Sequence, residues 1–222
     1  MVDIGWILEL VKVGKLVIRD SVGTAFSFNI EKDMIAVGHP SANTGNGLVE
    51  IFKLILGEWV LTGNIYPDYG TRYGFFGICL SLSGDGSRLA ITSNSVLGKP
   101  GVIIYYLNGA NWECNDIIYS RLKENTLFGK SVSMDLTGGK LLIGNPYTDT
   151  CKDKKGSAYL YTRIDTKWSK SHKFISKLDS DISLGCEVLL NSTGDIVTLR
   201  DRYNKDVRFT KPNKTWIESS PF

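Results

Sequence analysis

Long hydrophobic runs, a leading basic segment and closely spaced cysteines are all missing from this chain of 222 residues. The partly apolar stretch from Met1 to Asp20 is interrupted by Glu9, Lys12 and Lys15, so it is too charged to span a membrane. It also has no small-residue cleavage site after an apolar core, so we expect no signal peptide. We therefore favour a cytoplasmic or virion-associated location.

Cysteine patterns that bind metal are also absent. The four cysteines stand 35 to 37 residues apart without any C-x-x-C pair, which argues against a zinc site and favours four reduced thiols. They are Cys79, Cys114, Cys151 and Cys186. We predict no metal and no cofactor.

Histidine is scarce, and the net charge is small. Only His39 and His172 are present, neither stands in a catalytic motif, and we predict no catalytic residues. Lys and Arg total 26 against 23 Asp and Glu, and this net charge of +3 gives no reason to expect nucleic acid as a partner. Carboxylate pairs contributed by separate repeats leave a cryptic glycoside hydrolase open as a third function.

Tryptophan, by contrast, recurs at nearly even steps. Its five positions are separated by 53, 53, 56 and 48 residues, which indicates an internal repeat of about fifty residues. The positions are Trp6, Trp59, Trp112, Trp168 and Trp216. A residue that returns at one place in every repeat is typical of packing between repeats, so we expect structural tryptophans in preference to sugar-stacking ones.

Each repeat also carries two glycine landmarks. One glycine follows each of the first four tryptophans by 17 or 18 residues and opens an alternating segment, as in Phe76 to Leu82 and Phe128 to Met134. A second glycine precedes another alternating segment, at Gly47, Gly101 and Gly156. A further strand lies between these two landmarks, and another begins at the tryptophan, so we predict four strands in each repeat. The second strands are Met34–Val37, Arg88–Thr92, Lys140–Ile143 and Asp195–Leu199.

Four antiparallel strands per fifty residues are typical of a propeller blade. The sequence predicts an all-β fold, a single small β-propeller domain over 1–222 with four to five four-stranded blades. The repeats fall at about 22–75, 76–127, 128–183 and 184–222, and residues 1–21 hold an extra N-terminal strand and linker. That strand, Trp6–Val13, either joins the last blade or starts a further, incomplete blade.

The landmarks resemble the FG-GAP repeats of integrin alpha-subunit propellers and of many bacterial and viral proteins. The third repeat carries the resemblance best, from Phe128-Gly129 through Gly144-Asn145-Pro146 to Trp168. The resemblance implies a propeller and implies little about function. The calcium loop of that family is not matched, because turns such as Ser83–Gly86 have too few carboxylates, and we interpret them as tight hairpin turns.

Antiparallel blades place the long connections at one end, where binding residues are common. We predict long loops at His39–Asn46, Ser93–Pro100 and Asn145–Lys155, and between successive repeats. The tyrosine-rich segment before Phe76 is the best candidate for a partner surface, since Tyr and Arg are frequent interface anchors. The predicted partner-binding residues are Tyr66, Asp68, Tyr69, Arg72, Tyr73, His39, Tyr147, Lys152 and Lys154.

Three functional hypotheses follow. The first is a non-catalytic protein-interaction or structural propeller, of which a viral structural or host-interaction component is one form. The second is a carbohydrate-binding, lectin-like propeller, and the third is the cryptic hydrolase. A protein partner is favoured, and self-association through the N-terminal strand is a further expectation.

Overall fold

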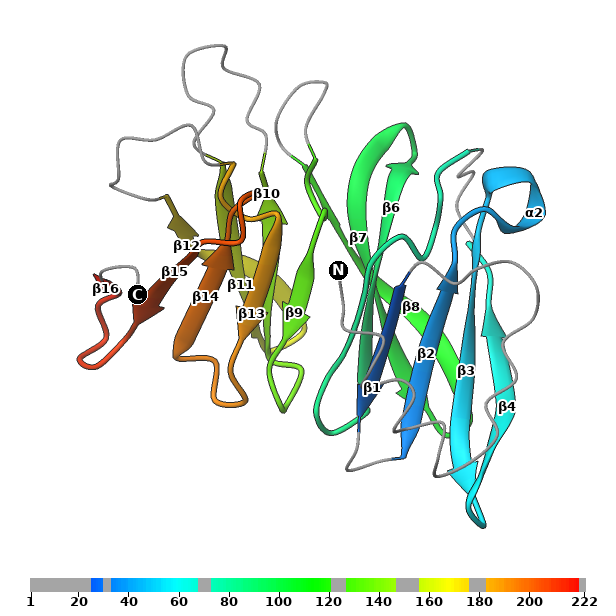
Figure 1. Cartoon of the computed structure of the whole chain (residues 1–222). Coiled ribbons are helices and arrows are strands. Elements are labelled where there is room, and N and C mark those ends of the chain that lie inside the picture. The colour runs from blue at the N-terminus through cyan, green and yellow to red at the C-terminus, as the bar shows by residue number, and fades with distance from the viewer. Residues whose placement is uncertain are drawn as a thin grey trace.

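A computed structural model describes residues 25–29, 33–67, 73–120, 127–146, 156–175 and 183–219. These residues form four antiparallel sheets of four strands each, and in every sheet the strands lie in sequence order. The four sheets stand in a row in Figure 1, from blue and cyan at one end to orange and red at the other. The predicted propeller fold is confirmed, and we number the sheets as blades 1 to 4.

The strands follow the repeat. Blade 1 holds β1 (Ala25–Asn29), β2 (Met34–His39), β3 (Leu48–Ile55) and β4 (Glu58–Ile65), with the short helix α2 (Ala42–Gly45) between β2 and β3. Blade 2 holds β5 (Leu80–Leu82), β6 (Arg88–Val96), β7 (Lys99–Asn108) and β8 (Asn111–Tyr119). Blade 3 holds β9 (Val132–Met134), β10 (Lys140–Asn145), β11 (Ser157–Ile164) and β12 (Lys167–Phe174). Blade 4 holds β13 (Glu187–Leu190), β14 (Ile196–Arg200), β15 (Asp206–Thr210) and β16 (Ile217–Ser219).

The core lies between the blades. We call the side of a blade that faces the next repeat its leading face and the opposite side its trailing face. In the middle strands, the leading face of blade 2 includes Ala90 and Ile104, which pack with Leu141 and Ile143 on the trailing face of blade 3. Separate apolar clusters join blade 1 to blade 2 and blade 3 to blade 4 in the same way. Side chains alternate across each strand, so the central strands of blades 2 and 3 supply the cores on both of their sides.

A β-bulge explains why the tryptophans face backwards. The pairing between β11 and β12 shifts at Leu160/Tyr161, which leaves Ser171 as an extra residue in β12. Because an extra residue reverses the alternation, Trp168 points to blade 2 while Phe174 points to blade 4. The same shift occurs in blades 1 and 2. The predicted packing of tryptophans between blades is confirmed for Trp112, Trp168 and Trp216, whereas Trp59 packs against residues of its own blade.

The glycines that open the first alternating segment of a repeat lie where two backbones meet closely. Gly77 and Gly185 both have positive φ, and each lies beside a small residue of the preceding blade, Gly38 and Gly144 respectively. A Cβ on Gly38 would collide with the carbonyl oxygen of Gly77, and one on Gly144 with that of Gly185. Glycine is therefore required by both conformation and space.

The structure corrects two expectations about the connections. The segment Ser93–Pro100 is no long loop, because β6 and β7 continue to a two-residue turn at Leu97 and Gly98. Gly101 pairs with Ser93, as Leu48 pairs with His39, so Gly101 is equivalent to Leu48 and not to Gly47. The four strands predicted for the last repeat are confirmed, since β16 supplies the fourth.

Residues 6–13 lie outside the described ranges, so their predicted strand stays a prediction. Within those ranges, no helix is long and apolar enough to cross a membrane.

Candidate functional site

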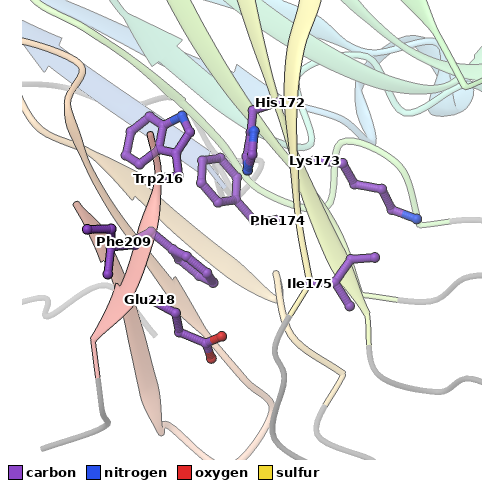
Figure 2. A pocket seen from close by; sticks show the side chains of 8 residues that line it. His172, Lys173, Phe174, Ile175, Phe209, Trp216 and Glu218 are labelled. Atoms are coloured by element: carbon purple, nitrogen blue, oxygen red, sulfur yellow. The ribbon is translucent and has the colours of Figure 1, made fainter. Parts of the chain in front are cut away.

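A groove of about 330 Å³ lies between the outer strands of blades 3 and 4. Figure 2 shows His172 and Phe174 of β12 on one side, facing Trp216 and Phe209 of blade 4 on the other. Its full lining is His172, Lys173, Phe174, Ile175, Phe209, Trp216, Ile217 and Glu218. The groove is thus aromatic inside, with Glu218 directed between the two strands.

One position of the repeat differs between the two junctions that flank blade 3. By strand pairing, Tyr106 in blade 2 corresponds to Thr162 in blade 3. At the junction of blades 2 and 3, the phenol of Tyr106 accepts a hydrogen bond from Trp168 Nε1 at 3.2 Å and donates one to Asp116 at 3.1 Å. Thr162 has no ring to fill that space at the next junction, and its hydroxyl bonds Ser171 at 3.0 Å.

Aromatic contacts hold the floor of the groove. The Phe174 ring lies 4.9 Å from Phe209 and 4.9 Å from Trp216, the latter edge to face. The His172 ring lies 4.6 Å from Phe174 and 6.0 Å from Trp216. Such pairs favour tilted geometries and fix one another's orientation, so the floor is preorganised.

Charge at the groove is mixed. The lining itself holds one lysine, Lys173, and one carboxylate, Glu218. The ammonium groups of Lys170 and Lys173 lie 5.5 and 5.7 Å from the ring centre of Tyr159, on the side of blade 3 that packs against blade 2. The Lys211 ammonium instead lies 5.7 Å from the ring centre of Trp216. Burial, together with the nearby Lys211, lowers the pKa of His172 below its usual 6.5, so the imidazole is neutral at pH 7. Lys211 is thus the cation beside the aromatic floor, and it favours an acidic group next to a bound apolar side chain.

Sequence reasoning placed the binding surface elsewhere. Of the nine predicted partner-binding residues, the structure describes His39, Tyr66 and Tyr73. Tyr66 and Tyr73 are 52% and 68% exposed, as a contact surface requires. His39 is instead 4% exposed and bonds Glu50 at 3.0 Å, so its ring is not presented to a partner. The other six lie outside the described residues: Asp68, Tyr69, Arg72, Tyr147, Lys152 and Lys154.

The groove was missed because its residues look structural in sequence. In the sequence, His172 stands in no motif and Trp216 is a repeat landmark. No local signal marks the groove, because its rings meet only through the packing of blade 4 on blade 3.

The acidic turns serve the hairpins. The Asp85 carboxylate accepts hydrogen bonds from Ser83, at 2.6 Å, and from the backbone and side chain of Ser87. Burial acts against ionisation, but these hydrogen bonds outweigh it and lower the pKa of Asp85. Across the described part of the chain, no three His, Cys, Asp or Glu side chains gather as a metal site. The thiols of Cys79 and Cys186 both have a pKa raised by burial, which makes them weak nucleophiles.

Comparisons with known proteins agree with the fold. No protein-family model matches the chain, and no curated protein matches its sequence. Among solved structures, TolB from Acinetobacter baumannii is 13% identical with a TM-score of 0.51, covering 89% of this chain and 43% of its own. Sqt1 from Saccharomyces cerevisiae is 13% identical with a TM-score of 0.55, covering 89% of this chain and 48% of its own.

A third solved structure is named for an enzyme. The periplasmic gluconolactonase PpgL from Pseudomonas aeruginosa is 11% identical with a TM-score of 0.52, and the match covers 93% of this chain and 74% of that one. The chain spans about half the length of TolB and Sqt1. At such low identity the likeness shows the fold alone, and that fold is a β-propeller.

Proposed function

We propose that this chain is a non-catalytic, protein-binding propeller. Its groove between β12 and β16 binds an acidic peptide segment that carries one large apolar side chain. The observation that carries the proposal is the combination of an aromatic floor with the Lys211 ammonium beside it. An apolar anchor buries its surface against Phe174, Phe209 and Trp216, and an acidic neighbour of the anchor meets Lys211.

Exposed apolar side chains at the rim support this use of the groove. Ile175 is 44% exposed and Ile217 is 53% exposed, and each belongs to the lining. They add apolar surface at the mouth of the groove, where a bound peptide would exclude water. Anchors in interfaces gain affinity from such a rim because it shields the centre from solvent.

A sugar ligand fits this groove less well. Stacking of a sugar needs a free indole face, but the Lys211 ammonium lies over the Trp216 ring at 5.7 Å and Phe174 packs against the same ring. The carbohydrate-binding alternative therefore lacks its main contact here. A narrower form of the proposal, a viral structural or host-interaction component, is supported by the family resemblance alone.

The test begins with selection of phage-displayed random 12-residue peptides on the purified chain. We expect enrichment of peptides with several Asp or Glu residues around one aromatic or large aliphatic residue. Fluorescence polarisation of a labelled selected peptide then gives its dissociation constant. A glycan array and a panel of chromogenic glycosides, run on the same protein, test the two other functions.

Variants locate the binding. Ile217→Glu and Lys211→Glu place negative charge at the groove, and we expect each to weaken the binding of the peptide at least tenfold. Ile164→Glu and Lys99→Glu are matched controls on other exposed surfaces, since Ile164 is 61% exposed and Lys99 is exposed. Equal affinity in the groove variants, a groove-dependent glycan signal or glycoside turnover would each overturn the proposal.

The long-loop face is a second proposed contact surface. Its exposed Tyr66 and Tyr73 support this role. If a selected peptide keeps its affinity for Ile217→Glu but loses it in Tyr66→Ala and Tyr73→Ala, the chain is still a protein-binding propeller, with its site on that face.

A further inference from the structure

The leading faces of blades 1 to 3 share one composition. At the three central positions of the second and third strands, these faces carry apolar side chains that are almost fully buried against the next blade. In order, they are Ala36, Val49 and Ile51 in blade 1, Ala90, Val102 and Ile104 in blade 2, and Leu142, Ala158 and Leu160 in blade 3.

Blade 4 is polar at all three of these positions. The strand register places Thr198, Asp206 and Arg208 there, and none of the three is buried. The trailing face of the same strands keeps its apolar residues, among them Val197, Leu199 and Val207. The last blade therefore has one apolar face, toward blade 3, and one polar face.

The contacts that join successive blades also stop at blade 4. The hydroxyls of Ser27, Ser81 and Ser133 each accept a hydrogen bond from a backbone N–H of the next blade, at 2.9, 2.9 and 3.0 Å. The equivalent residue of β13 is Leu189, which has no hydroxyl and is 50% exposed. No following blade can be held at this position.

A second joining contact is lost in the same way. Arg88 Nη1 donates to the carbonyl of Thr137 at 2.5 Å, and Lys140 Nζ donates to the carbonyls of Thr193 and Gly194 in the next blade. The equivalent residue in blade 4 is Ile196, which is 37% exposed. An aliphatic side chain cannot reach over and donate to a further turn.

Arg200 obstructs the last place of close approach. In blades 1 and 3 the equivalent positions are Gly38 and Gly144, where even a Cβ would collide with the next blade. The Arg200 guanidinium is held there by Glu187 at 2.7 Å and by both oxygens of Asp206 at 2.7 and 3.2 Å. This ionic network fills the space that, at the other junctions, the glycine equivalent to Gly77 or Gly185 of the next blade occupies.

We infer that blade 4 is a terminal blade, whose leading face is built to meet water and rejects a further blade, whether that is blade 1 of the same chain or a blade of a second copy. Repeat proteins need such polar end units for solubility. Within the described residues, no apolar cluster joins blade 4 to blade 1. In the described residues, blade 4 therefore does not close the ring by packing directly on blade 1.

The first test asks whether the leading face is solvated. Arg200→Ala and Arg208→Ser should each lower Tm by less than about 4 °C and leave the sedimentation coefficient unchanged, because solvated ion pairs contribute little. The matched positive control is Ile104→Arg, which places at the packed leading face of blade 2 the arginine that blade 4 has at the equivalent position, Arg208. We expect it to lower Tm by well over 10 °C or to prevent folding. A loss of the control's size in either blade 4 variant would overturn the inference.

The second test restores an apolar leading face. The variant Thr198→Ala/Asp206→Val/Arg208→Ile introduces the residue types that blade 2 has at these three positions, Ala90, Val102 and Ile104. We expect its weight-average mass in sedimentation equilibrium to rise with concentration above that of the natural chain. Thr198→Ser/Asp206→Asn/Arg208→Lys is the polar control and should behave as the natural chain does. If the mass of the apolar variant does not rise, the polar residues at positions 198, 206 and 208 of the natural chain are not what prevents a further blade from packing, and the inference is wrong.

Discussion

The indole N–H of Trp168 donates a hydrogen bond to the phenol of Tyr106, 3.2 Å away and 62 residues earlier in the chain. The Tyr106 hydroxyl in turn donates a hydrogen bond to the Asp116 carboxylate at 3.1 Å. The guanidinium groups of Arg88 and Arg163 lie 5.1 and 5.4 Å from the centre of the Tyr106 ring. One tyrosine thereby seals the outer junction of blades 2 and 3. Blade 3 has Thr162 at the equivalent position, so this pair of hydrogen bonds has no counterpart at the next junction.

Removal of the Tyr106 hydroxyl should therefore weaken the junction without opening a cavity. Tyr106→Phe loses two hydrogen bonds, each with a net contribution of about 1 kcal/mol, so we expect a loss of about 1–2 kcal/mol in the free energy of unfolding. Urea unfolding followed by circular dichroism measures it. Tyr203→Phe is the control, because Tyr203 is 60% exposed and its contact with Arg202 lies at the surface. Equal losses in both variants would contradict the sealing role.

Gly144 tests the close approach of two backbones. In Gly144→Ala the new methyl group would collide with the carbonyl oxygen of Gly185, so either blade 4 must shift or the chain must strain. We expect a loss of about 2–3 kcal/mol or more, in the upper range for overpacking. Gly63→Ala is the matched control, because a Cβ on Gly63 meets nothing within 4 Å, and this strand position should change by only a few tenths of a kcal/mol. Similar thermal shifts in the two proteins would argue against the tight contact.

His172 should make stability depend on pH. Burial and Lys211 lower its pKa in the folded protein, so as pH falls through the ordinary value of 6.5 the unfolded chain takes up the proton first. The free energy of unfolding should therefore fall between about pH 7.5 and the lowered pKa, and become level with respect to this group below it. His172→Gln should reduce that slope, and since His39 is kept in both proteins, the difference between their urea-unfolding curves isolates His172. An unchanged slope would contradict the shift.

Much of the fold could be predicted because the tryptophans and glycines that recur in each repeat are needed for packing between the blades. The even steps of Trp59, Trp112 and Trp168 predicted blades, and the alternating segments after Gly77 and Gly129 predicted the first strand of each. The second strands were also placed to within a few residues. Hairpin register was harder, since the predicted loop at Ser93–Pro100 is strand with a tight turn, and alternation alone does not tell where a strand stops.

The candidate site could not be predicted in the same way. Phe174 is far in sequence from Phe209 and Trp216, and each of the three fits its place in the repeat as an ordinary packing residue. Only the packing of blade 4 on blade 3 brings the three rings together. His39 shows the opposite error, because its place at a loop suggested a contact surface while the fold buries it against Glu50.

The sequence by itself determined the number of repeats and the order of strands within each, because local alternation and glycine conformation are properties of neighbouring residues. The tertiary structure decided which side of each strand meets which blade, because β-bulges at Thr62, Asn115 and Ser171 reverse the alternation midway along the outer strands. It also decided that the polar residues of the last repeat, Arg200 and Asp206 among them, share one face. A face is made by pairing across strands, and that pairing is long-range in the chain.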